Sequence, residues 1–197
     1  TWPLAASTQA GKLPTIGFLG PTTSSAQVKW IAAFLQRLRQ LGWIEGRNLA
    51  MSIYWASGRD NMEAVARELL ASDPEVIVAQ EYTVLELAKT TKPVVFGYSG
   101  DPLVVKLVES WAKPGGNFTG MSYLAIELVG KRIELLKEWL PHTRRVAILA
   151  RPQHPGEHLE RQASEAAAKK LELEFSYFPY TSQSFLPAHD LSELGAV

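Results

Sequence analysis

Short apolar runs recur along this chain, and each is followed by a segment in which apolar residues return every three or four positions. Short apolar runs between turn residues are typical of buried parallel strands, and a 3.6-residue repeat is typical of a helix packed on one face. The runs that precede position 100 are residues 15–19, 49–55, 75–79 and 94–97. Strands that alternate with helices in this way predict an α/β lobe with a parallel sheet and right-handed crossovers.

The first helix of this lobe is expected over residues 25–41, after a hydroxyl-rich turn. Its inward face is formed by apolar residues at helical spacing: Val28, Ile31, Leu35 and Leu38. Ser24 or Ser25 is expected to cap the helix, which leaves other backbone N–H groups that suit a small anion such as a carboxylate. A second helix is expected to start at Asp60, with Glu63 completing a capping box. A short helix that ends at Lys89 is expected after the loop of residues 80–83, and another helix over residues 104–111.

The strand and helix pattern restarts after Asn117. An extended segment is expected over 118–123, a helix over 126–140, a strand over 145–150, a helix over 156–171 and a strand over 173–177. We therefore expect a hinge near 116–123 and a second lobe with few strands for an independent parallel sheet. This suggests that the chain is truncated, or that self-association or another partner completes the lobe.

The expected organisation has four parts, in chain order. Residues 1–11 are an export-signal remnant or disordered, 12–118 the N-terminal α/β lobe, 119–180 a partial second α/β lobe, and 181–197 a tail. From the residues alone, Trp2–Ala6 followed by small polar residues fits a signal-cleavage region and a frayed terminus equally well.

The charge balance and the absence of cysteine exclude several function classes. Lys plus Arg and Asp plus Glu number 20 each, so neither nucleic acid nor an anionic membrane is favoured as a partner. The lack of cysteine excludes disulfides, thiolate metal sites and a cysteine nucleophile within these residues.

His154 and His158 have the i, i+4 spacing of two metal ligands on one helical face, but Pro155 disfavours a helix at His154. No catalytic or phosphate-loop motif is found, so we expect neither catalytic residues nor a metal or other cofactor.

Several segments, in order, carry a family resemblance: Ile16–Leu19, Leu41–Asn48, Tyr54–Gly58, Gly100–Pro102, Lys113–Gly120 and Lys131–Leu136. Together they resemble ABC-transporter substrate-binding proteins of the tryptophan/tyrosine-binding type. The resemblance implies a type I periplasmic-binding-protein-like fold, with a parallel-sheet lobe and an incomplete second α/β lobe. It also implies export to the periplasm, an ABC permease as partner, and an amino-acid-like or other polar ligand held between two lobes. Roughly the last third of the family's chain has no counterpart here.

Loops at the carboxyl ends of strands supply the candidate ligand-binding residues. They are Thr22, Thr23, Ser24, Gln80, Glu81, Tyr82, Thr83, Ser99, Asp101, Tyr123, Arg151 and His154. The hydroxyls after the first strand suit a carboxylate, Glu81 an amino group, and Tyr82 an apolar or aromatic group. Arg151 suits a two-pronged contact with a carboxylate.

Each candidate also has a plain structural reading. The hydroxyls after the first strand, or the Asp101 carboxylate, could instead cap a helix. Glu81 or Arg151 could instead be an ordinary charged residue on the solvated surface. Two other function classes stay open: a ligand-sensing regulatory lobe of the same fold, and an α/β enzyme whose catalytic part lies elsewhere.

Overall fold

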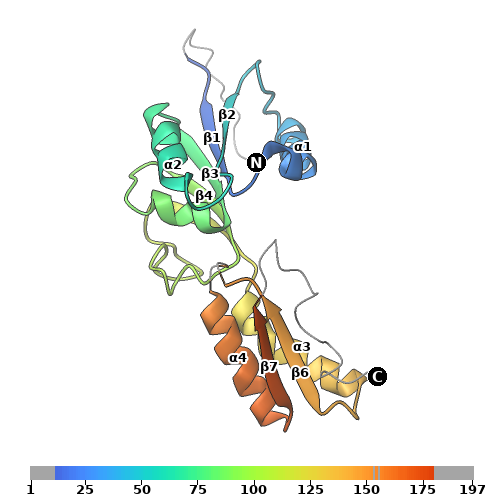
Figure 1. Ribbon diagram of the computed structural model, residues 1–197. Helices are drawn as coiled ribbons and strands as arrows, with labels where there is room; N and C mark the ends of the chain where they lie inside the picture. Colours follow the sequence, from blue (N-terminus) through green and yellow to red (C-terminus); the bar gives the residue numbers. More distant parts are fainter. Residues whose placement is uncertain (1–11, 153, 155, 180–197) are drawn as a thin grey trace. The chain divides into compact units, whose positions relative to one another are not determined.

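The computed structural model describes residues 12–152, 154 and 156–179 (Figure 1). The expectations for residues 1–11 and 181–197 lie outside the described residues. The chain divides between Val95 and Phe96 into two compact units, unit 1 (residues 1–95) and unit 2 (residues 96–197). The lobe limits expected from the sequence stay a prediction.

Unit 1 is an α/β unit in which strands and helices alternate along the chain. Its elements are β1 (Thr15–Gly20), α1 (Ser24–Gln40), β2 (Ala50–Trp55), α2 (Met62–Ala71), β3 (Val76–Gln80), the 3₁₀ helix η1 (Glu81–Leu87) and the start of β4 (Val94–Tyr98). The sheet has the order β2-β1-β3-β4-β5, in which β5 is Phe118–Ser122, and β1 pairs in parallel with both β2 and β3. The expected parallel α/β sheet is confirmed.

The core of unit 1 forms around β1 because this strand lies between two others and is covered by helix α2. Phe18, Leu19, Leu69 and Ile77 are each at most 2% exposed. A Cβ atom added at Gly17 would lie 3.1 Å from Pro74 and 3.2 Å from Leu69. The missing side chain at Gly17 therefore lets the end of α2 approach the strand closely.

Helix α1 differs from the expectation in its start and in its packing. The N-cap is Thr23, and it makes no side-chain capping bond, so the expected cap by Ser24 or Ser25 is wrong. None of the helix's residues is fully buried, and Val28, expected on the inward face, is 62% exposed. The helix meets the sheet at Phe34, whose ring centroid lies 6.1 Å from that of Phe18.

The start of α2 is also not capped as expected. Asn61 is the N-cap and has no side-chain capping bond, so the capping box from Asp60 to Glu63 does not form. Glu63 instead pairs with Arg67 one turn later, at 2.9 Å between carboxylate and guanidinium. This exposed i,i+4 pair adds little stability, and α2 is held mainly by its buried face.

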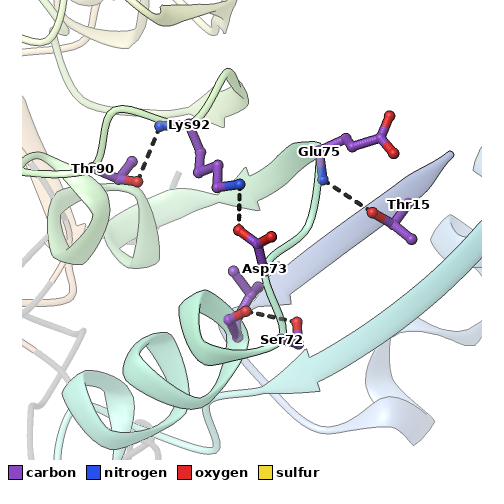
Figure 2. Close-up of polar contacts among 7 residues, drawn as sticks. Thr15, Ser72, Asp73, Glu75, Thr90 and Lys92 are labelled. Carbon is purple, nitrogen blue, oxygen red and sulfur yellow. Dashed lines mark hydrogen bonds and ion pairs between the residues drawn. The ribbon is translucent and has the colours of Figure 1, made fainter. Parts of the chain in front are cut away.

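The turn from α2 into β3 is fixed by polar contacts at the surface (Figure 2). Asp73 adopts a left-handed backbone with φ 51°, and its carboxylate lies 2.5 Å from the Lys92 ammonium. The hydrogen bond and the positive charge of Lys92 lower the pKa of Asp73. The Glu75 N–H donates to the Thr15 hydroxyl at 3.0 Å. These contacts tie the turn to the strands on both sides of it.

Unit 2 contains the end of β4 and five further elements: β5 (Phe118–Ser122), α3 (Ala125–Trp139), β6 (Arg145–Ala150), α4 (Glu157–Lys170) and β7 (Glu174–Pro179). β5 follows β4 in the five-stranded sheet, and β6 and β7 form a separate parallel pair. Val129, Ile133, Ala168 and Leu173 form a buried cluster with Val146 and Phe175 packed against it. Helices α3 and α4 therefore share one core with β6 and β7.

The helix expected over residues 104–111 is wrong, because turns and bends occupy this segment. Lys106 has a φ of 58°, which a right-handed helix does not allow. The segment turns back on itself, since the Leu107 N–H donates to the Pro102 carbonyl at 2.9 Å. Within the residues that the structure describes, no helix is both long and apolar enough to cross a membrane.

Candidate functional site

In unit 1, the loops that follow β1, β2 and β3 meet around the side chain of Tyr82. The Tyr82 hydroxyl donates to the Pro21 carbonyl at 2.6 Å, which joins η1 to the loop after β1. The Arg59 guanidinium carbon, from the segment after β2, lies 5.6 Å from the centre of the Tyr82 ring. A cation at this distance from an aromatic face is attracted to it. Tyr82 therefore organises the carboxyl edge of the sheet.

The side chain of Thr83, the next residue, hydrogen-bonds to the backbone at the ends of β1 and β3. Its side chain is fully buried, and its hydroxyl lies 2.6 Å from the Gln80 carbonyl and 3.3 Å from the Leu19 carbonyl. The single proton of a hydroxyl can be donated to either oxygen. Thr83 therefore joins the end of β1 to the end of β3, and its role in ligand binding stays a prediction.

The hydroxyl residues after β1 lie exposed at the start of α1. The hydroxyls of Thr23 and Ser25 lie 3.1 Å apart, and the Thr22 hydroxyl donates to the Thr23 carbonyl at 3.4 Å. Thr23 makes no side-chain capping bond to α1, and Ser24 is the first residue of that helix. The first N–H groups of a helix carry partial positive charge and favour anions. This loop can therefore accept a carboxylate on its hydroxyls and helix N–H groups.

Gln80 and Glu81 lie at the junction of β3 and η1, and both are half-buried. Glu81 has a φ of 52°, an uncommon value for a non-glycine residue. The next two residues contact the loop after β1 and the end of β1, through the hydroxyls of Tyr82 and Thr83. The sequence predicts these residues as a loop that leads into a short helix, whereas η1 already begins at Glu81.

Arg59 is a member of this group that the sequence analysis does not single out. It follows β2 in the stretch Ser57–Arg59, at the same edge of the sheet as the other loops. Its position after a parallel strand is a signal available from the sequence, because the carboxyl ends of parallel strands share one edge. The stacking partner Tyr82 is visible only in the structure.

Unit 2 brings together a different set of candidates. Asp101 accepts hydrogen bonds from the backbone N–H groups of Leu103 at 2.7 Å and Val104 at 3.4 Å, so its carboxylate stabilises the turn that follows β4. Ser99 is buried, whereas Tyr123 is 57% exposed and its N–H donates to the Tyr98 carbonyl at 3.2 Å. The Asp101 carboxylate thus acts as a cap, although the segment that it caps is a turn rather than a helix.

Two loops of unit 2 approach each other closely at glycine residues. A Cβ added at Gly156, just before α4, would lie 3.4 Å from the Cα atom of Gly100 and 3.7 Å from Ile126. Gly156 has a φ of 84°, a backbone region that favours glycine. The loop after β4, the start of α3 and the start of α4 therefore lie side by side in unit 2.

A cavity of about 470 Å³ lies in unit 2 along β6, between residues of α3 and α4. Arg151 and His154, both predicted from the sequence, line this cavity together with Glu157 and Glu160. His154 Nδ1 lies 3.7 Å from the Glu160 carboxylate. The remaining lining is largely apolar and includes Val129, Ile133, Leu136, Ile148 and Phe175. The cavity therefore combines an apolar wall with charged groups near the start of α4.

Burial and hydrogen bonding shift two acid groups near this cavity. Burial raises the pKa of Glu160, and the charge of His154 opposes that rise. A hydrogen bond with Glu157 raises the pKa of Tyr177, whose ring lies 4.2 Å from the Arg161 guanidinium carbon. One carboxylate oxygen each of Glu157 and Glu160 is buried without a hydrogen-bond partner among the described atoms. Within the described ranges, no cluster of three or more His, Asp or Glu residues could hold a metal ion.

A family model described as "ABC transporter substrate binding protein" matches residues 21–182. A tyrosine-binding protein of Clostridioides difficile (strain R20291) is 25% identical over 142 residues, which are 70% of this chain and 40% of that protein. The chain thus covers well under half of the length of this curated relative.

Solved structures match the fold over most of the chain. A conserved domain protein from Vibrio cholerae O1 biovar El Tor (strain N16961) is 26% identical with a TM-score of 0.75. The ABC domain of a Streptococcus pneumonia protein in complex with L-Trp is 22% identical with a TM-score of 0.69, a likeness of fold alone. Each match covers 86% of this chain and 58% of the solved chain. The family model spans most of the residues, and the chain belongs to the ABC transporter substrate binding protein family.

Proposed function

We propose that this chain is part of the solute-binding component of an ABC importer and that it binds a small amino-acid-like molecule. The family and the tyrosine-binding relative support this proposal. The solute would be captured outside the cytoplasmic membrane, in the periplasm, and presented to an ABC permease without a chemical step. Placement of the solute between two lobes stays a prediction.

The observation that carries the proposal is the group of loops around Tyr82 in unit 1. Solutes bind at the carboxyl ends of strands in open α/β sheets, and loops from three strands meet there. The Tyr82 ring offers an aromatic surface, and Arg59 supplies a positive charge beside it. The start of α1 adds hydroxyls and helix N–H groups that suit a carboxylate. An amino acid with an apolar or aromatic side chain matches these groups.

Unit 2 offers its own binding groups, which we propose as further contacts for a solute. Arg151 and His154 line the cavity beside β6, and Glu157 and Glu160 stand at the same end. Arginine binds carboxylates with two parallel hydrogen bonds, and a carboxylate pairs with an amino group. These groups match the two charged ends of an amino acid.

The proposal is tested by binding measurements on the 197-residue chain. The L-amino acids are screened by ligand-observed NMR, which detects affinities as weak as about 1 mM, a binding free energy of about −4 kcal/mol. The melting temperature of the chain is then measured with each amino acid that binds, because a ligand that binds only the native state stabilises it by mass action and raises this temperature. We expect aromatic amino acids to bind, and Tyr82→Ala to reduce their affinity about tenfold or more.

The matched control is Trp139→Ala, which removes an aromatic side chain that is 80% exposed at the end of α3 and is not one of the proposed binding groups. This variant is expected to bind with unchanged affinity. Circular dichroism of each variant confirms that the fold is kept. If no amino acid binds the chain, or if Tyr82→Ala binds as well as the original, the proposed site is wrong.

A further inference from the structure

The indole ring of Trp55, the last residue of β2, lies across the end of β1. Trp55 stands opposite Gly20 in the parallel register of the two strands, and the Ala56 N–H donates to the Gly20 carbonyl at 2.9 Å. A Cβ atom added at Gly20 would overlap the ring, at 2.5 Å from Cε3 of Trp55. Gly20 is not among the glycines with a positive φ, so the close approach of the ring explains why this position lacks a side chain.

An aromatic cluster in the core of unit 1 holds this ring in place. The ring centroids of Phe18 and Trp55 lie 6.0 Å apart with the planes tilted by 57°, and Phe18 also contacts Phe34 of α1. Tilted rings at this distance attract each other. Phe18 is 2% exposed, whereas Trp55 is only half-buried. Trp55 is therefore anchored to the core and keeps some accessible surface at the carboxyl edge of the sheet.

The ring lies beside the loop that carries the hydroxyl groups of the proposed solute site. Gly20 is followed directly by Pro21–Thr23, the three residues that connect β1 to α1. The Tyr82 hydroxyl donates to the Pro21 carbonyl at 2.6 Å. Because β2 and β3 lie on opposite sides of β1, the end of β1 and its loop are contacted from the β2 side by Trp55 and from the β3 side by Tyr82. The N–H groups at the start of α1, which suit a carboxylate, are next along the chain.

We propose that Trp55 is a specificity-determining residue of the solute site, where its ring packs against the side chain of a bound aromatic amino acid. The inference rests on the proposed function and adds to Tyr82 a second aromatic surface, from β2. Indole is large, flat and rigid, and two aromatic groups attract each other beyond the effect of buried area, by about two- to tenfold in affinity. An aliphatic side chain gains only the burial. Trp55 therefore favours aromatic over aliphatic solutes.

The test compares the affinities of L-phenylalanine and L-leucine for the full chain, measured by ligand-observed NMR. We expect Trp55→Leu to weaken the binding of L-phenylalanine about fivefold or more and that of L-leucine by less than about twofold, so the preference for the aromatic solute falls. Trp55→Phe keeps a ring and should keep most of this preference. A purely structural role of Trp55 would weaken the binding of both solutes alike, which would contradict the proposal.

Two further variants complete the comparison. Trp43→Leu is the matched control, because it makes the same substitution in the turn between α1 and β2, at the amino ends of the parallel strands. Its preference between the two solutes should equal that of the original chain. Gly20→Ala displaces the ring without removing it, since the new Cβ overlaps the ring, and should lower the preference as Trp55→Leu does. It keeps the proposal falsifiable if Trp55→Leu does not fold, and circular dichroism checks the fold of each variant.

The ring can also be observed directly by fluorine NMR, with fluorinated tryptophan at all six tryptophan positions. The resonances of Trp55 and Trp43 are identified by their loss in Trp55→Phe and Trp43→Leu. L-phenylalanine should shift the Trp55 resonance more than the Trp43 resonance. If no amino acid binds the chain, the proposed function is wrong and this inference with it. If L-phenylalanine binds, but the Trp55 resonance does not move and neither Trp55→Leu nor Gly20→Ala lowers the preference, the proposed function stands and this inference is overturned.

Discussion

Replacing Thr83 by valine tests whether its hydroxyl holds the loops of unit 1 together. Valine has nearly the same shape, so the change removes the hydroxyl and leaves the packing almost intact. The part-buried Gln80 carbonyl, 2.6 Å from the hydroxyl, then loses a donor. The Leu19 carbonyl at 3.3 Å loses its second potential donor. We expect Thr83→Val to lower the free energy of unfolding.

The size of the loss follows from the burial of this group. A typical intramolecular hydrogen bond adds about 1 kcal/mol to stability, and leaving a buried acceptor unpaired costs about 1–3 kcal/mol. Thr83 is fully buried and its contact with the Leu19 carbonyl is buried, whereas its bond to the Gln80 carbonyl is part-buried. We therefore expect a loss of about 2 kcal/mol for Thr83→Val. Thr83→Ser keeps the hydroxyl and loses one methyl group, at a cost of about 1 kcal/mol.

The assay is native-state hydrogen exchange of β1 and β3, because it reports on unit 1 even if the two units unfold separately. The larger effect is expected for valine and the smaller one for serine. If Thr83→Val exchanges as slowly as the original chain, the hydroxyl adds no stability and the reasoning is wrong. If serine is the more harmful change, the methyl group of Thr83 matters more than its hydroxyl.

Three further predictions concern a glycine and two carboxylates. Gly120→Ala should lower the free energy of unfolding by at least about 2 kcal/mol, measured by denaturation, because the new Cβ would lie 2.1 Å from the Phe96 carbonyl oxygen. The Lys92 ammonium lowers the pKa of Asp73, so their pair stabilises the fold above the ordinary value of 3.8 and this gain disappears as the pH falls through the lowered pKa. Melting curves should therefore separate Asp73→Asn from the original near neutral pH and converge in acid. Burial raises the pKa of Glu160, which destabilises the fold as the pH rises above 4.5, so Glu160→Gln should melt at a higher temperature near neutral pH and at the same temperature in acid.

Most of the fold could be predicted from the sequence because its strands are short, apolar and regularly spaced. The strand expected over 145–150 has the bounds of β6, and the helix expected over 126–140 differs from α3 by one residue at each end. Periodicity succeeds here because burial on one face determines both the pattern and the structure.

Local signals failed where a neighbouring contact decides the outcome. Ser24 and Asp60 have the right chemistry for caps, but the chain enters both helices without a side-chain capping bond. The apolar residues after Pro102 suggested a helix, and the left-handed backbone at Lys106 ends any helix there. Capping and turn choices involve about 1 kcal/mol each, so packing elsewhere easily overrides them.

The candidate site was predicted at the level of loops and not at the level of single side chains. The sequence identifies the segment from Gln80 to Thr83 because it follows a buried strand. It does not reveal that the Tyr82 hydroxyl bonds to Pro21, or that Arg59 lies beside the Tyr82 ring. These contacts join residues far apart in the chain, and no pattern within one segment encodes them.

The hydrogen-bonding capacity that remains at this edge limits what a solute can contact in unit 1. The Thr83 hydroxyl and the Tyr82 hydroxyl are both used by backbone carbonyls, at 2.6 Å in each case. Polar groups committed in this way hold the loops in place, because their release would leave buried carbonyls unpaired. The groups that stay suited to a solute are the first N–H groups of α1, the exposed hydroxyls of Thr22 and Thr23, and the ring of Tyr82. This edge can therefore recognise a molecule that places a carboxylate on the N–H groups and hydroxyls and an apolar or aromatic group on the Tyr82 ring.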